Sequence, residues 1–247
     1  MRKWTAVLLL LVTAGTHAEV RLSAAGWRDD LSGRVDRDGQ TLDFERDLDA
    51  QADAARGLRA EWDTGRWWPD LSAATVRSRG SGHVSRSGPL SFGPIVIPGS
   101  ATTQIDTDAS YDDTELAARW PLAWGPLRVS LGLAAKWLDG EVRITDTSDG
   151  STSRQRYRIL FPEAHTVLAW RVWPGLQAEG VAQGLSYRGD RAMEWRALLR
   201  VTRLAPLLVE GGWQQKRYRV VDDDGAVVDA RLAGPWLALG LAFGAGR

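Results

Sequence analysis

The feature that most constrains the fold is a two-residue alternation of apolar and polar side chains. Residues 127–137 place Leu, Val, Leu, Leu, Ala and Trp on one phase and Arg, Ser, Gly, Ala and Lys on the other. The alternation recurs at 165–172, 194–201 and 234–243. Successive side chains of a β-strand point to opposite faces, so each segment is predicted to be a strand with one apolar face. Helical heptads are absent and the 26 glycines are scattered, which disfavours helices.

Two architectures fit this alternation. A soluble periplasmic β-sandwich turns the apolar face inward, whereas a transmembrane β-barrel turns it outward to lipid and keeps the polar face in the lumen. The segments run for about ten residues, the length that a tilted strand needs to cross a bilayer. No stretch after the N-terminal 18 residues has 18 consecutive apolar residues, and the longest apolar candidate, the uncharged residues 233–246, has 14 residues and is too short for a transmembrane helix. We therefore favour the membrane barrel.

The connections between the segments are unequal in length. Short turns are expected at 67–70, 121–126, 173–175 and 205–206, and polar links that are often longer at 33–56, 80–113, 146–154, 189–191 and 222–229. Short turns at one end and longer loops at the other are typical of outer-membrane barrels. We expect an all-β, transmembrane, antiparallel up-and-down barrel of about ten strands, with eight as the competing count. The strands are expected at 19–32, 57–66, 71–80, 113–121, 127–145, 155–172, 176–188, 192–204, 207–221 and 230–243.

The tryptophans support this frame. The chain has 13 Trp against four Phe and four Tyr. An indole has an apolar body and a polar N–H, and it prefers the membrane–water interface. Two interfacial girdles are therefore expected. The first, beside the short turns, contains Trp67, Trp68, Trp120, Trp124, Trp170 and Trp173; the second, toward the other strand ends, contains Trp27, Trp137, Trp195 and Trp213. Trp62 and Trp236 do not fit this pattern.

The first 18 residues have the layout of a secretory signal peptide. Arg2 and Lys3 precede an apolar stretch at 5–12, and a small residue, Ala18, marks the expected cleavage point. We expect residues 19–247 to form a single outer-membrane domain with 29 basic against 31 acidic residues. This balance argues against a nucleic-acid partner, which requires a basic face. The absence of cysteine excludes a disulfide scaffold, a cysteine nucleophile and a thiolate metal site.

The polar faces of the strands predict a charged lumen. Its expected members are Arg59, Glu61, Asp63, Glu115, Arg119, Arg128, Arg171, Glu179, Glu194, Arg196, Arg200, Glu210 and Lys216. Buried charges must be paired, and a ten-strand barrel is narrow enough for side chains to close it. A salt-bridged lumen is the favoured interpretation. A narrow polar pore, in which rings of charge select ions, is the alternative.

Three short motifs resemble a known family. The stretches 26–33 (GWRDDLSG), 42–49 (LDFERDLD) and 67–73 (WWPDLSA), with the Pro/Trp short turns, resemble small proteobacterial outer-membrane β-barrel proteins of unassigned activity. The resemblance implies an outer-membrane location, a monomer, and outer-membrane lipid and the barrel-insertion machinery as partners. Such barrels commonly end on an aromatic residue, whereas here residues 244–247 follow Phe243.

Candidate catalytic residues are few, and we predict no catalytic residue, no cofactor and no metal site. His83 lies in the 80–113 link, which carries Asp106, Asp108, Asp112 and Asp113 on its far side, and no local motif links His83 to any one of these carboxylates. A His–Asp pair activates water in some enzymes, and the ten-stranded omptin proteases use acidic residues and a His near the loop end. A solvated loop histidine is the simpler interpretation, and His165 is expected to join the polar lumen. The apolar residues 90–98 are expected to fold back and plug the barrel. We expect a structural or passive barrel, with a narrow pore or an outer-membrane hydrolase as alternatives.

Overall fold

The computed structural model describes residues 18–37, 39–49, 51–64, 68–87, 90–92, 95–97, 102–124, 126–148, 150–187, 189–221 and 227–244. The predicted signal peptide lies outside these residues except for Ala18, and the first strand begins at Glu19. No helix within the described part of the chain is long and apolar enough to span a bilayer.

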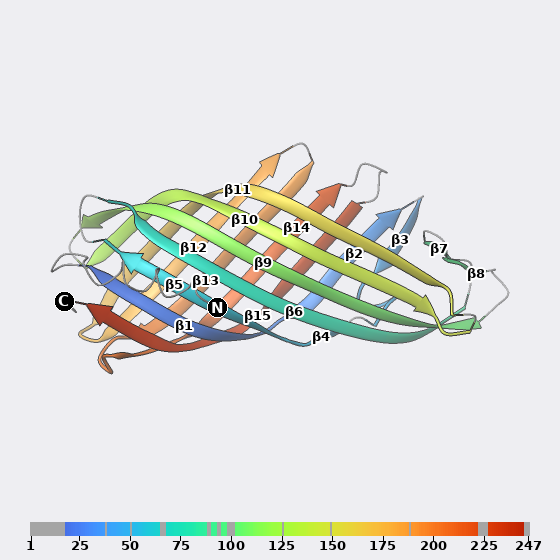
Figure 1. Cartoon of the computed structure of the whole chain (residues 1–247), viewed down its shortest axis with the longest axis horizontal. Helices are drawn as coiled ribbons and strands as arrows, with labels where there is room; N and C mark the ends of the chain where they lie inside the picture. Colours follow the sequence, from blue (N-terminus) through green and yellow to red (C-terminus); the bar gives the residue numbers. More distant parts are fainter. Residues whose placement is uncertain are drawn as a thin grey trace, which may run out of the picture.

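Ten long antiparallel strands form a closed barrel (Figure 1). In their order around the ring they are β1 (Glu19–Arg28), β5 (Ala54–Asp63), β6 (Asp70–Ser87), β9 (Thr102–Trp124), β10 (Leu127–Asp146), β11 (Thr152–Trp173), β12 (Leu176–Tyr187), β13 (Asp190–Val201), β14 (Leu207–Val221) and β15 (Val227–Gly244). The ring closes where β1 pairs with β15, from Glu19 opposite Gly244 to Trp27 opposite Trp236. This closure confirms the predicted all-β barrel and favours ten strands over eight.

Closure supplies the hydrogen bonds that a lipid-facing strand requires. The bilayer core holds no water, so the N–H and C=O groups of an open sheet edge would remain unpaired there. The outer phase of the strands is mostly apolar, as in residues 127–137 of β10, which suits it to contact with lipid. Its exposed members include Leu58, Leu116, Leu131, Leu133, Leu160, Leu199, Leu237 and Leu239.

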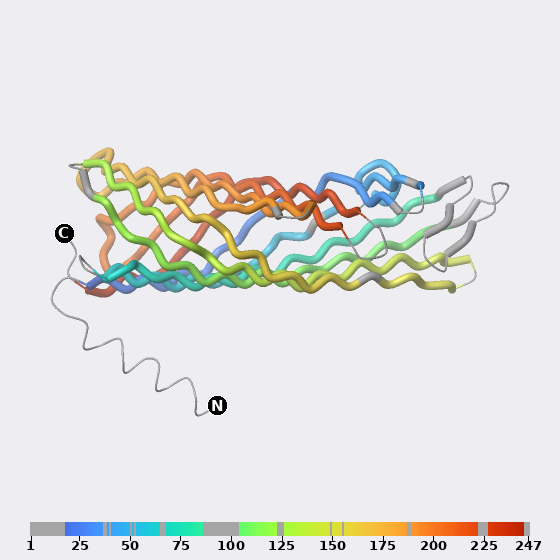
Figure 2. The backbone as a smooth tube through the Cα atoms, turned by 90° about the horizontal axis from the view of Figure 1, so that it is seen from above, coloured from blue at the N-terminus to red at the C-terminus, as the bar shows by residue number. Residues whose placement is uncertain are grey.

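The neighbouring strands β6, β9, β10 and β11, which we call the long wall, extend well beyond the rest of the barrel at the loop end (Figures 1 and 2). Of these, β9 has 23 residues and β10 has 20, about twice the length that spans a bilayer. Most of the predicted 80–113 loop is therefore strand, and that prediction is wrong. The outer phase of β9 turns acidic at Asp106, Asp108 and Asp112, while Ile105 faces inward. A search for strands with an apolar outer face does not find this part of β9, because its outward side chains are charged.

The expected turn at 121–126 is also too long. Pro121 lies inside β9, opposite Ser130 of β10. The neighbour on the other side, β6, begins only opposite Arg119, so β9 has one partner at this position. A proline lacks the N–H for a second ladder, and it is tolerated where the second partner is missing.

The first long loop folds into the loop-end mouth. β2 (Asp30–Arg37) continues the line of β1 and pairs with β15; β3 (Gln40–Asp43) pairs with β2, and β4 (Gln51–Ala52) pairs with β6. Leu42 of β3 is buried together with Phe44 and Leu48 of the segment that follows it. These side chains pack against Ile105 and Ile144 of the long wall. The described apolar filling thus comes from this loop.

Residues 90–98 were expected to plug the barrel. Their described backbone forms a two-stranded hairpin, β7 (Leu90–Phe92) with β8 (Ile95–Ile97). Gly93, Pro94, Pro98 and the side chains of the hairpin lie outside the described residues, so the plug remains a prediction.

The seam between β1 and β15 provides a test of closure. A Cβ atom on Gly240 would lie 2.1 Å from the backbone oxygen of Leu22, so Gly240→Ala must push the two strands apart. We expect it to lower the free energy of unfolding by about 1–3 kcal/mol, the usual cost of overpacking. Heat-modifiable gel mobility measures the unfolding midpoint. Gly26 lies on the same seam with no atom within 4 Å of an added Cβ, so Gly26→Ala should behave as wild type; equal effects would contradict a packed seam.

Candidate functional site: the charged lumen

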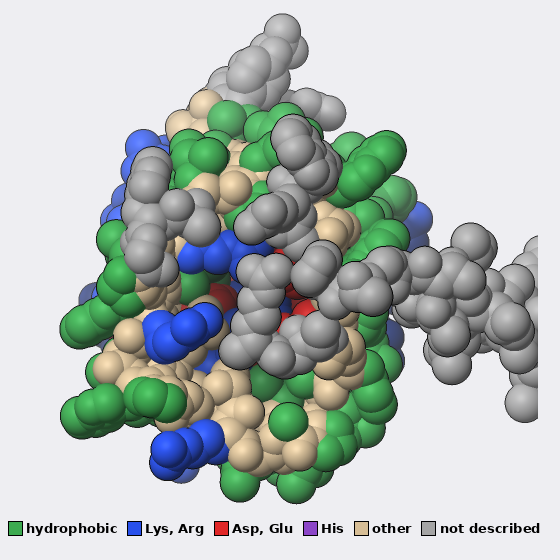
Figure 3. Space-filling model, turned by 90° about the vertical axis from the view of Figure 1, so that its left-hand side faces the viewer, with side chains coloured by type: hydrophobic (Ala, Val, Ile, Leu, Met, Phe, Trp, Pro, Cys, Tyr) green, Lys and Arg blue, Asp and Glu red, His purple; other side chains and the backbone are tan. Residues whose placement is uncertain are grey.

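The candidate site is the set of charged side chains on the inner phase of the strands. Seven of the 13 predicted members are buried: Glu61, Arg119, Glu179, Glu194, Arg200, Glu210 and Lys216. Five are half-buried: Arg59, Asp63, Glu115, Arg128 and Arg196. Arg171 is exposed at the turn end, where its backbone N–H donates to the Pro126 carbonyl. Figure 3, which views the turn end, shows acidic and basic side chains in the interior of the ring, and further basic side chains on its rim.

A lysine cluster, consisting of Lys136 and Lys216 with their carboxylate partners, occupies the middle of the lumen. Lys136 Nζ donates to Glu194 Oε2 at 2.5 Å, and Glu115, Glu163 and Asp113 lie within 4 Å of the same nitrogen. Lys216 Nζ donates to Asp113 Oδ2 at 2.6 Å. Because β9 and β14 are five places apart in the ten-strand ring, this last bond crosses the whole lumen.

An arginine cluster lies nearer the turn end and is centred on Arg200. Its guanidinium donates to Glu210, contacts Glu179 at 2.9 Å and reaches Glu61 of β5 at 3.4 Å. Arg59 lies 3.6 Å from Glu210 and 3.7 Å from Glu61, and Arg21 lies 3.0 Å from Glu61. Three cations and three carboxylates therefore balance each other in the interior of the barrel, which is the condition for keeping charges buried.

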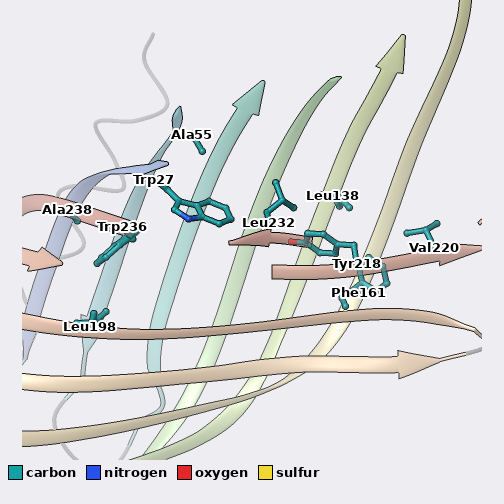
Figure 4. Close-up of a cluster of buried hydrophobic side chains, with 11 residues drawn as sticks. Trp27, Ala55, Leu138, Phe161, Leu198, Tyr218, Val220, Leu232, Trp236 and Ala238 are labelled. Atoms are coloured by element: carbon teal, nitrogen blue, oxygen red, sulfur yellow. The ribbon is translucent and has the colours of Figure 1, made fainter. Parts of the chain in front are cut away.

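Two tryptophans line the lumen and contact these cations. Arg59 lies 5.0 Å and Arg196 5.4 Å from the ring centre of Trp236, and Lys216 lies 5.6 Å from that of Trp27. Trp27 also donates from its indole nitrogen to the Gly234 carbonyl at 3.2 Å. The assignment of Trp27 to a girdle is therefore wrong, because it occupies the inner phase of β1. Figure 4 shows both indoles among the inward-facing side chains. Cation–π contact explains an inward indole.

The other predicted girdle residues divide as follows. Seven are exposed on the outer surface: Trp68, Trp120, Trp170 and Trp173 toward the short turns, and Trp137, Trp195 and Trp213 farther along their strands. Trp67 and the side chain of Trp124 lie outside the described residues. Five of the seven lie on the apolar outer phase of their strands, and the other two, Trp68 and Trp173, lie at the short turns; these positions are compatible with the expected interfacial role.

Several members of the network were not among the predicted residues. Asp113 had been placed at the end of a loop, and Asp70 in a short turn, although Asp70 accepts a 2.6 Å bond from Arg128. Glu163 shares the inner phase of β11 with His165, two residues later, and that spacing was the signal that could have identified it. His165 itself is buried, with Nδ1 4.0 Å from Glu115, so it lies within the polar lumen as expected.

The side chains leave little free space. Between the two clusters a cavity of about 40 Å³ remains, lined by Arg59, Glu61, Glu115, Arg196 and neighbouring residues. A space of this size holds one or a few water molecules.

The candidate catalytic pair lies elsewhere, on the outer face of the long wall. His83 Nδ1 hydrogen-bonds Asp106 across β6 and β9, and both side chains are exposed. The same face carries other cross-strand pairs, such as Arg77 with Asp112 at 2.6 Å. There, the hydrogen bond from Arg154 holds the pKa of Glu141 below its ordinary value. No group of three or more potential metal ligands occurs among the described residues.

Comparisons with known proteins identify the fold. No family model and no curated protein matches the sequence. Among solved structures, the outer membrane protease OmpT from Escherichia coli has a TM-score of 0.51 at 13% identity, covering 94% of this chain and 98% of that one. The translocator domain of the autotransporter NalP from Neisseria meningitidis has a TM-score of 0.47 at 13% identity, covering 98% and 94%. The attachment invasion locus protein Ail of Yersinia pestis has 0.43 at 12%, covering 92% and 99%. The fold is that of bacterial outer-membrane β-barrels.

Removing one cation tests the lysine cluster. Lys136→Met leaves four carboxylates facing one another without their shared partner, so we expect the free energy of unfolding to fall by about 3–5 kcal/mol. Urea unfolding in lipid vesicles measures it. Arg77 pairs with Asp112 in the open, and Arg77→Met is the matched control, with an expected loss of at most about 1 kcal/mol. Equal losses in the two variants would contradict a buried cluster.

Proposed function

We propose that this protein is a closed, passive barrel of a bacterial outer membrane, with no conducting lumen and no catalytic role. The observation that supports it is the bond from Lys216 to Asp113, which joins opposite sides of the ring. Together with the Arg200 contacts to Glu61 and Glu179, it fills the cross-section with paired charges. A solute would have to break several buried ion pairs to pass.

The two alternatives are less well supported. A pore requires a continuous polar path, whereas the cavity in the lumen has a volume of only about 40 Å³. A hydrolase requires a site that encloses its substrate, whereas His83 and Asp106 lie on an exposed outer sheet surface. The similarity to OmpT concerns the fold, which alone does not carry function. Cleavage of a peptide or lipid that is lost in His83→Ala would overturn the passive role.

Planar-bilayer recording tests closure. We expect no stable conductance steps from the folded wild-type protein, because the paired side chains leave no water-filled path. Folding in the same sample is checked by heat-modifiable mobility. Steps whose size changes in Arg200→Ala would contradict the proposal, since they would mean that current passes this residue.

We propose outer-membrane lipid as the main partner. On seven strands the first outward charge beyond the apolar belt, toward the loop end, is an exposed arginine: Arg28, Arg56, Arg77, Arg158, Arg191, Arg217 and Arg231. We call this set the arginine collar. Arg28, Arg56 and Arg191 form no ion pair with any described residue. Cations at this height suit phosphate groups of lipid headgroups. We also propose that the barrel-insertion machinery assembles the chain as a monomer.

Lipid charge tests the collar. The wild type should unfold at a higher temperature in vesicles containing phosphatidylglycerol than in pure phosphatidylcholine. The triple variant Arg28→Gln, Arg56→Gln, Arg191→Gln should lose most of this stabilisation by anionic lipid. The expected loss of unfolding free energy is about 1 kcal/mol per arginine at low salt. The control pair Arg171→Gln, Arg203→Gln removes exposed arginines at the turn end. If the control loses as much as the triple variant, the collar assignment is wrong.

A further inference from the structure

An apolar pocket lies on the loop-end side of the lysine cluster. It lies between the long wall on one side and β14, β15 and the first loop on the other, and its volume is about 120 Å³. The apolar side chains that line it include Phe44, Leu138, Val142, Val220, Val228 and Leu232. Leu138, Val220 and Leu232 appear among the inward-facing side chains in Figure 4. The pocket lies where the two apolar clusters of the barrel meet.

The size and lining of the pocket limit what it can hold. An engineered apolar cavity of about 150 Å³ binds benzene, so a pocket of 120 Å³ accommodates about one ring. Its floor is Tyr218, which donates to Asp113 of the lysine cluster at 3.0 Å. The carboxylate of Asp113 beneath the floor disfavours an anion, and the mostly apolar walls make the loss of hydration of any charged ligand costly.

One polar atom in the lining lacks a partner. The Tyr111 hydroxyl is buried and makes no hydrogen bond with any described residue. Two other hydroxyl groups of the lining do have partners: Ser78 donates a hydrogen bond to Asp29 at 3.2 Å, and Tyr218 donates one to Asp113. A buried hydroxyl without a partner is costly, and a ligand with one polar group would satisfy it.

The pocket also borders an open strand edge. β11 pairs with β12 only from Ala164 to Trp173. The loop-end half of β11 therefore has no neighbouring strand on its β12 side among the described residues. Tyr157, which lines the pocket, lies on this loop-end half.

We propose that this pocket binds an uncharged molecule of single-ring size that carries one hydroxyl or carbonyl group. The ring packs among Leu138, Val220 and Leu232, and the polar group hydrogen-bonds the Tyr111 hydroxyl. The site is separate from the paired charges below it, so its occupation does not depend on whether the lumen conducts.

Fluorine NMR of 4-fluorophenol with the folded protein in detergent tests the site. We expect saturable binding of one molecule per barrel in the wild type. Gly140 lies on the inner phase of β10 in the pocket wall, and an added Cβ there would have its nearest neighbours at 3.8 Å and 3.9 Å. Gly140→Leu should therefore fill the pocket and abolish saturable binding without disturbing the backbone.

The matched control is Gly180→Leu, which adds the same side chain on the outer phase of β12, where no atom lies within 4 Å of a Cβ. It should bind 4-fluorophenol like the wild type, and it corrects for partition into the detergent. Absence of saturable binding in the folded wild type, or unchanged binding in Gly140→Leu, would overturn the proposal.

A second pair of measurements isolates the hydroxyl contact. Tyr111→Phe should weaken 4-fluorophenol binding about 2- to 12-fold, the worth of one hydrogen bond. Fluorobenzene has no polar group, so Tyr111→Phe should leave its affinity unchanged. Equal effects of the variant on both probes, or none on either, would rule out Tyr111 as the polar contact.

Discussion

The pairing of buried charges across the lumen is the interaction on which the rest of this structure depends. A ten-strand ring with an apolar outer face turns its polar phase inward, and that phase here carries arginines, lysines and carboxylates. Charges in a narrow, dehydrated space are tolerated only if they are paired. The Lys216–Asp113 bond joins strands on opposite sides of the ring, and Arg200 connects β13 to β5. In the proposed function, the same pairs that stabilise the interior also close the lumen.

The outer surface follows from the same segregation of side chains, because the phase that does not face the lumen is the apolar one. Strand closure satisfies the backbone in lipid, the apolar phase suits the hydrocarbon, and in the proposal above the arginine collar lies at the headgroups on the loop side. Beyond the collar the long wall inverts its pattern. Its outer face becomes charged, as at Asp106 and Asp112, and its inner face becomes apolar, as at Ile105. The apolar pocket exists because this inverted wall faces the first loop and β14 above the paired charges.

The sequence was sufficient to predict the barrel, the strand number and most of the lumen, because alternation and turn length report directly on which face meets lipid. It failed where one residue type serves two environments. Trp27 was assigned to the interface because indoles prefer it, but Lys216 provides a cation for its ring inside the lumen. Asp113 was assigned to the end of a loop because the residues before it, such as Asp108 and Asp112, are polar on the outward face of β9, so no apolar face marks this part of the strand. Pairing partners such as Lys136 with Glu194 depend on shear around the ring, which no local pattern in one strand encodes.

The central claim is that charges from opposite sides of the barrel pair with each other. A double-mutant cycle on Lys216→Met and Asp113→Asn, measured as unfolding free energy in lipid vesicles, tests it most directly. Because Nζ and Oδ2 are 2.6 Å apart, the two losses should be strongly non-additive, with a coupling of about 1–3 kcal/mol. Losses that add within about 0.5 kcal/mol would mean that the two side chains do not meet across the lumen, and would contradict the proposed closure of the lumen by paired charges.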